Sequence, residues 1–157
     1  MPKTKIPLTP EGRLELAKRY LKNAKEELRK AGIDRVVGRY IDLKHISSAC
    51  GIAYLVALEA LKALFISKGL ISSEELNQRL KKVEGYYKGL KEIKGLGKDR
   101  DILLGLFDDV YTILHISGYY RELQSKKSID DGFEKVEKII KIVEKHINGK
   151  PTPAKKL

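Results

Sequence analysis

His115 and the polar side chains around it are the strongest candidates for chemistry in this sequence of 157 residues. Four polar residues share its face at helical spacing: Asp108, Tyr111, Thr112 and Tyr119. A neutral histidine near a carboxylate is the usual equipment for acid and base catalysis. The same strip also fits a network whose members satisfy one another inside a core, and the sequence leaves both interpretations open.

The other two histidines have simpler explanations. His146 falls near the end of a predicted helix, where a cation interacts favourably with the negative end of the helix dipole. His45 follows Asp42 by three residues at the start of another predicted helix, a spacing that allows a local hydrogen bond. We expect structural or surface roles for both, with His45 kept as a candidate binding residue.

The sequence lacks the motifs of the common cofactor and metal sites. It holds no Gly-x-x-x-x-Gly-Lys phosphate loop, no His-Glu-x-x-His motif and no Cys/His cluster at zinc spacing. The Glu-x-x-His pairs that di-iron bundles carry on two helices are missing as well. We therefore expect no cofactor and no metal.

Five stretches with helical periodicity must position these side chains. No alternating run indicates a strand. The pattern predicts an all-α fold, an antiparallel four-helix bundle plus one additional helix, in a single domain of residues 1–149. Residues 150–157 are expected to form a flexible basic tail. The five predicted helices cover about residues 10–31, 42–68, 73–91, 99–120 and 129–148.

Turn and cap residues mark several of these boundaries. Thr9 can cap the first helix, and Gly32 can end it in a left-handed conformation. Ser72 and Glu75 have the spacing of a capping box. These signals support the predicted ends of the first and third helices.

The segment 42–68 is the most apolar of the five. It mixes small residues with Leu and Ile, which is typical of a helix buried on most sides. Glu59 and Lys62 interrupt it, so no apolar run reaches the ~20 residues that span a bilayer. We expect no membrane partner. Glu59 shares a face with apolar residues and should need a partner such as an inward-facing Tyr, His or Arg.

Cysteine usage and the N-terminal residues favour a cytoplasmic protein. Cys50 is the only cysteine, so no internal disulfide can form, and its small neighbours predict a buried side chain. The first residues lack the apolar core of a signal peptide.

The net charge of +11 is unevenly distributed. Residues 1–31 contribute +5 and residues 150–157 contribute +3, so the rest of the chain is nearly balanced. Among the basic residues, 24 are Lys and only 8 are Arg, which disfavours the bidentate base contacts of sequence-specific DNA recognition. The charge fits attachment to acidic surfaces such as ribosomes, and equally solubility or adaptation to heat.

The segment from Tyr40 to Gly69 resembles the HEPN (higher eukaryotes and prokaryotes nucleotide-binding) domain family. The phrase Leu-Glu-Ala-Leu-Lys-Ala-Leu at 58–64, with alanines before it and Gly69 after it, carries the resemblance, which covers roughly residues 10–148. It implies an all-helical bundle that often dimerises. Members include metal-independent ribonucleases and toxins, nucleotide-binding proteins and proteins that have lost activity.

The sequence departs from the ribonuclease motif of that family. Ribonuclease members carry Arg-x4–6-His late in the domain, and Arg and His of two protomers meet in one cleft. His115 is the matching histidine, but the positions for the arginine hold Asp108, Asp109 and Val110. Carboxylates at that spot would weaken phosphate binding, so we expect degenerate or altered chemistry.

These observations favour a homodimeric, non-catalytic module that binds RNA, a nucleotide or a protein partner. The alternative is a ribonuclease with His115 as acid and base, Tyr119 as an oriented hydroxyl, and Arg121 or Arg39 as the missing cation. That alternative needs His115 of two chains to line one exposed basic cleft. The candidate catalytic residues are therefore His115, Asp108, Asp109 and Tyr119, and the candidate binding residues are Arg39, His45 and Arg121.

Overall fold

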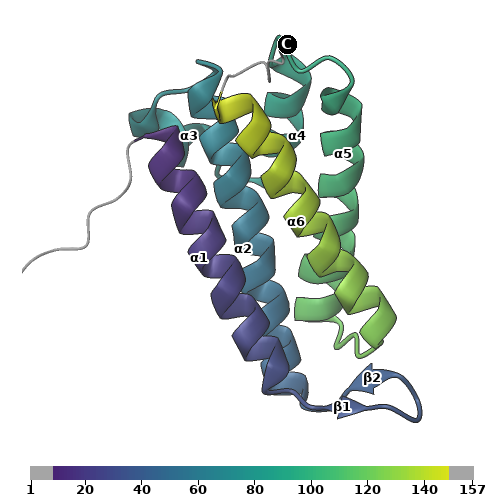
Figure 1. The fold of residues 1–157 in the computed structure, drawn as a ribbon. Helices are drawn as coiled ribbons and strands as arrows, with labels where there is room; N and C mark the ends of the chain where they lie inside the picture. The colour runs from purple at the N-terminus through teal and green to yellow at the C-terminus, as the bar shows by residue number, and fades with distance from the viewer. Residues whose placement is uncertain (1–8, 149–157) are drawn as a thin grey trace, which may run out of the picture.

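The computed structural model describes residues 9–148, which form a bundle of long helices with a small hairpin at one end (Figure 1). The all-α prediction is confirmed, and the predicted tail at 150–157 lies outside the described residues. The elements, in chain order, are α1 (Pro10–Arg29), β1 (Ile33–Asp34), β2 (Arg39–Tyr40), α2 (Leu43–Ser67), a 3₁₀ turn η1 (Ser73–Glu75), α3 (Leu76–Arg79), α4 (Val83–Glu92), α5 (Asp99–Val110), a π-helix η2 (Tyr111–Tyr120) and α6 (Lys126–Asn148).

The ends of α1 and the start of α2 follow the local signals in the sequence. The Thr9 hydroxyl accepts the N–H of Gly12 at 3.0 Å, as an N-cap should. After α1 the chain reverses at Gly32, whose φ of +72° is the left-handed conformation that glycine adopts without strain. Asp42 caps α2 by accepting the N–H of Lys44 at 2.9 Å.

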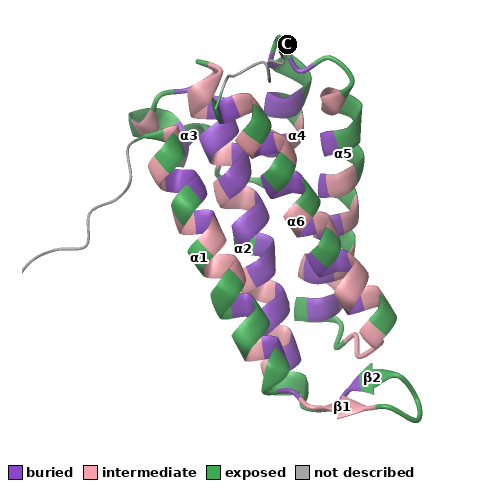
Figure 2. Ribbon diagram, in the orientation of Figure 1, coloured by how far each residue is buried: buried purple, intermediate pink, exposed green. Residues whose placement is uncertain are grey.

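Helix α2 is the centre of the bundle. It lies beside α1 along its length and also packs on α6 and η2, and buried residues run along it from end to end (Figures 1 and 2). By length and composition it would pass as a membrane span, but 67% of its most apolar window is buried inside the protein. Its apolarity therefore reflects a core position, and Cys50 is fully buried in that core as predicted.

The predicted helix 73–91 is wrong as a single element. The Ser72–Glu75 capping box forms as expected, but the helix that it begins ends at Arg79. An extended residue, Lys82, then leads into α4. The chain can turn this tightly because residue 85 is glycine: a Cβ there would lie 2.6 Å from the carbonyl oxygen of Arg79.

The predicted helix 99–120 changes its type halfway. It is α-helical to Val110 and continues as the π-helix η2, with right-handed helical backbone at the junction. Gly118 in η2 packs directly on Cys50 of α2.

The prediction that the chain forms no strands was also wrong. Residues Ile33–Asp34 and Arg39–Tyr40 pair antiparallel in the segment between the predicted helices 10–31 and 42–68. Two-residue strands are too short to produce the alternating pattern by which a strand is recognised in a sequence.

Glu59 has the buried partner that its position required. Its carboxylate lies 3.1 Å from a guanidinium nitrogen of Arg13 on α1, with side-chain exposures of 12% and 8%. Lys62, one turn further along α2, lies 3.2 Å from the same carboxylate. The ion pair joins α1 to α2, two helices that pack against each other along their length.

Replacing Gly118 by alanine tests the close contact between η2 and α2. The added Cβ would meet the Cys50 sulfur at 2.6 Å, so we expect Gly118→Ala to lower the free energy of unfolding by roughly 1–3 kcal/mol. Gly105 on α5 is the matched control, because a Cβ there meets nothing within 4 Å. Gly105→Ala should raise stability by about 0.5–1 kcal/mol. Urea denaturation measures both, and equal effects of the two substitutions would contradict the packing.

Replacing Glu59 by glutamine tests the buried ion pair. The substitution keeps the shape but leaves the charge of Arg13 buried without its main counter-ion, so we expect a loss of roughly 3 kcal/mol. Glu15→Gln is the control, since that carboxylate is 69% exposed and, among residues 9–148, pairs only with Lys18, at 3.5 Å. Its effect should stay below about 0.5 kcal/mol. A loss for Glu59→Gln no larger than for the control would show that the pair contributes nothing.

Candidate functional site

The side chain of His115 lies in a group of four tyrosines, which we call the aromatic cluster. Tyr54 of α2 stacks on the histidine ring, with 4.3 Å between ring centroids and 21° between ring planes. The other three tyrosines come from η2, at centroid distances of 5.4 Å for Tyr111, 6.1 Å for Tyr119 and 5.1 Å for Tyr120.

The π-helix explains why so many rings meet at one histidine. A π-helix closes its hydrogen bonds between residues five apart, so residues four and five apart lie near the same face. Tyr119 and Tyr120 therefore both contact His115, the first stacked and the second edge-on. Gly51 of α2 leaves space for Tyr119, whose ring carbon would be 3.1 Å from a Cβ at that position.

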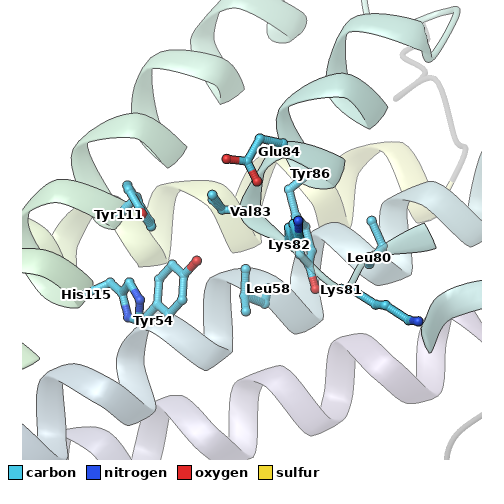
Figure 3. Close-up of a pocket in the computed structure, with 10 residues that line it drawn as sticks. All are labelled: Tyr54, Leu58, Leu80, Lys81, Lys82, Val83, Glu84, Tyr86, Tyr111 and His115. Carbon is cyan, nitrogen blue, oxygen red and sulfur yellow. The ribbon is translucent and has the colours of Figure 1, made fainter. Parts of the chain in front are cut away.

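Two pockets adjoin the aromatic cluster and share Tyr54 and His115 as a common wall. The first, which we call the lysine pocket, has a volume of about 370 Å³ (Figure 3). Lys81 and Lys82, at the break between α3 and α4, line it together with Glu84. The two pockets therefore adjoin each other at the stacked pair of Tyr54 and His115.

The second pocket, which we call the apolar pocket, has a volume of about 420 Å³. Its lining includes Tyr119 and Tyr120, which are 45% and 64% exposed, and the apolar side chains of Ile52 and Leu55. Exposed aromatic rings beside a hollow are suited to stacking on a planar ligand. The two pockets thus differ in chemistry, one cationic and one aromatic.

His115 is half-buried, and its burial holds the pKa of the imidazole below its usual value. Its contacts are with aromatic rings. Within residues 9–148, no hydrogen bond or ion pair joins the His115 side chain to a carboxylate or a cation. The ring is therefore a neutral, flat surface at pH 7 and lacks the carboxylate that would tune it as an acid or base.

The two candidate aspartates bond to other residues. Asp108 accepts a hydrogen bond from the Tyr87 hydroxyl at 2.9 Å, which together with burial raises the pKa of that phenol. Asp109 pairs with Lys135 of α6 at 2.9 Å, and this pairing raises the pKa of the lysine. The predicted polar strip is therefore divided: Tyr111 and Tyr119 join His115, and Asp108 serves the contact between α4 and α5.

The three candidate binding residues line neither pocket. Arg39 is exposed on β2, and Arg121 is exposed just after η2. His45 faces α1, where its Nδ1 lies 2.6 Å from a carboxylate oxygen of Glu27. The predicted partner, Asp42, is farther away, with 3.9 Å between its carboxylate and Nε2 of His45. The hydrogen bond from His45 lowers the pKa of Glu27.

His146 also has a specific partner. Its Nε2 lies 2.7 Å from a carboxylate oxygen of Asp99, which begins α5, and Lys145 contacts the same carboxylate at 2.8 Å. These two contacts, with Lys145 the stronger, hold the pKa of Asp99 below its usual value. His146 ties the end of α6 to the start of α5, which the helix dipole alone does not require.

Tyr54, Lys81, Lys82 and Tyr120 are the site residues that sequence reasoning missed. Tyr54 lies within an apolar run and has the pattern of a core residue. The two lysines fell inside a predicted helix, where they would have been ordinary solvent-facing charges. Tyr120 shares the histidine's face only in a π-helix, and no sequence signal for that was available.

Comparisons with known proteins place the chain among proteins of undescribed activity. A family model described as a domain of unknown function, DUF5618, matches residues 13–145. A solved structure described as a protein of unknown function from Dyadobacter fermentans is 30% identical, with a TM-score of 0.67, and the match covers 89% of this chain and 99% of that one. None of the curated proteins compared with the chain matches it.

A second solved structure, of a protein from Sulfolobus solfataricus, has a TM-score of 0.59 and 23% identity. The match covers 82% of this chain and 92% of that one. At this identity the similarity shows the fold alone.

The surroundings of His115 predict a depressed titration midpoint. Burial among aromatic rings disfavours the charged imidazolium, so we expect the pKa of His115 to lie below the usual value of 6.5. Because the folded state holds the proton less tightly than the unfolded state, this group's contribution to stability is complete above pH 6.5 and is lost as the pH falls from 6.5 through the lower pKa of the folded state. NMR titration of the imidazole proton signals measures the midpoint, with His115→Gln assigning the resonance. A midpoint at or above 6.5 would contradict the arrangement.

Proposed function

Because the chain belongs to the DUF5618 family, whose description gives no activity, we propose from its own side chains that it is a non-catalytic helical bundle that binds a nucleotide. The observation that carries the proposal is the stacked pair of Tyr54 and His115, with an aromatic pocket on one side and two adjacent lysines on the other. A nucleotide combines a flat base with a phosphate group, and these two chemistries match the two pockets. The HEPN resemblance implies the same class of ligand.

The apolar pocket suits the base. Tyr119 and Tyr120 present exposed rings, and Gly51 lets the Tyr119 ring lie close against α2 at the edge of the pocket. Stacking of a base on an aromatic side chain contributes about 1–3 kcal/mol and tolerates any base. The proposal therefore predicts affinity for nucleotides without a strong preference among the bases.

The lysine pocket suits the phosphate. Lys81 and Lys82 are exposed, and neither forms an ion pair with any described residue, so their charges are available to a ligand. Lys82 is also the N-cap of α4, so the positive end of that helix dipole adds to the charge of the two lysines. Glu84 lines the same pocket and would oppose an anion, so the phosphate is expected on the lysine side.

The surroundings of His115 support binding rather than RNA cleavage. Acid and base catalysis needs a proton carrier beside the reacting atoms and a cation for the developing phosphate charge. Asp108 bonds to Tyr87, Asp109 pairs with Lys135, and Arg39 and Arg121 line neither pocket. We accordingly give His115 the role of a stacking surface. The homodimer stays a prediction.

Fluorescence anisotropy with a labelled ADP tests the proposal. The wild-type chain should bind the probe, and Lys81→Ala with Lys82→Ala should weaken binding at least about tenfold, because a charged hydrogen bond contributes about 1.5–3 kcal/mol. The double variant Lys91→Ala with Lys94→Ala is the matched control, since both lysines are exposed and line neither pocket.

Competition with unphosphorylated adenosine separates the two pockets. The dissociation constant of adenosine derived from the competition should be equal in wild type and in the lysine variant, whereas Tyr120→Ala should weaken the binding of both ligands. Absence of ADP binding, or equal losses in the two lysine double variants, would refute nucleotide binding. Cleavage of RNA that disappears in His115→Ala would instead establish the ribonuclease alternative.

A further inference from the structure

The β1–β2 hairpin presents two neighbouring apolar side chains to solvent. Val36 and Val37, which we call the hairpin tip, are 95% and 58% exposed. The hairpin extends beyond one end of the bundle, beside the start of α2 and of α6 (Figure 1). Ile41 and Leu43, which follow it, are exposed as well, at 56% and 38%. Exposed aliphatic side chains gathered at one projecting end mark an interaction surface.

The tip has a defined conformation. The carboxylate of Asp34 accepts the N–H groups of Val36 at 3.1 Å and of Val37 at 3.3 Å, and the N–H of Gly38 bonds to the Asp34 carbonyl oxygen at 2.9 Å. The Gly38 carbonyl oxygen in turn accepts the N–H of Lys126, at the start of α6. The two valines are therefore held outward by the turn and by the bundle behind it.

Turn geometry does not account for the valines. Tight turns favour Gly, Pro, Asn, Asp and Ser, each for a local backbone reason, and a β-branched side chain offers none of these advantages. Their exposure also rules out a contribution to the core of this chain. The two valines are therefore available to a surface outside the chain.

Exposed cations lie in the hairpin and in the segments next to it. None of them forms an ion pair with a described residue. Asp34 and Asp42 accept hydrogen bonds from backbone N–H groups and keep their negative charges. Glu122, exposed just after Arg121, adds a third opposing carboxylate, so the cations outnumber these acids. The exposed cations at this end are Arg35, Arg39, Lys44, Arg121 and Lys127.

We propose that the hairpin tip inserts into the headgroup region of an anionic lipid bilayer, with the surrounding cations on the lipid phosphates. A convex apolar tip fits a yielding planar surface, and the positive rim complements the negative headgroups. Nucleic acid would use the cations but offers little apolar surface to two valines. The contact needs no spanning segment, so it revises the expectation of no membrane partner without altering the core position of α2. It is independent of the proposed nucleotide site.

Co-sedimentation with vesicles tests the proposal. The full chain should sediment with vesicles of phosphatidylcholine and phosphatidylglycerol and remain free with phosphatidylcholine alone. Val36→Ser with Val37→Ser keeps the net charge and places a favoured turn residue at both positions, so the hairpin should still form. We expect this variant to bind the anionic vesicles at least about tenfold more weakly. Ile102→Ser on α5, where the isoleucine is 48% exposed, is the matched control and should bind like wild type.

Two outcomes would overturn the proposal. One is failure of the wild-type chain to sediment with anionic vesicles. The other is binding that survives the valine substitutions but falls with Arg35→Ser and with added salt, which would indicate a purely electrostatic surface of the kind that also binds RNA. ADP binding should be equal in wild type and the valine variant, so the result is separable from the test of the nucleotide site.

Discussion

The close packing of α2 against its neighbours is the constraint on which the rest of the structure depends. Gly118 of η2 lies against Cys50, with room for no Cβ, and Gly132 of α6 approaches Leu114 of η2 equally closely. These contacts fix η2 between α2 and α6. Interiors this dense do not deform continuously, so the positions of the side chains on η2 follow from the small residues behind them.

The aromatic cluster is a consequence of that packing. Tyr54 meets His115 because α2 and η2 approach closely, and the wider turn of η2 brings both Tyr119 and Tyr120 to the same imidazole. Desolvation among these rings keeps the histidine neutral, which favours stacking over proton transfer. The π-helix η2 contributes tyrosines to the apolar pocket, and the break between α3 and α4 contributes Lys81 and Lys82 to the lysine pocket. Both halves of the candidate site thus depend on departures from regular α-helix.

Polar contacts set the relative positions of the helices around this core. The Arg13–Glu59 pair joins α1 to α2, and Asp99 receives both Lys145 and His146 where α5 begins and α6 ends. Two of the three histidines thus make hydrogen bonds between helices, His45 with Glu27 and His146 with Asp99. The third, His115, faces the pockets, which is why the candidate site has a single imidazole.

The sequence by itself determined the fold class, the extent of α1, α2 and α6, the Ser72–Glu75 capping box, the burial of Cys50 and the need of Glu59 for a buried partner. Each of these follows from local periodicity, a local cap or the cost of an unpaired buried charge, and all three can be recognised from residues that are close together in the sequence.

Only the tertiary structure decided the composition of the site. The sequence places Asp108 and His115 on one helical face. In the structure the hydroxyl of Tyr87 donates a hydrogen bond to Asp108, and the ring of Tyr54 stacks on His115. The break at Lys82, the π-turns of η2 and the two-residue strands likewise depend on contacts between distant segments. Which atoms meet across helices is set by packing, and packing partners far apart in the chain leave no periodic trace in a single sequence.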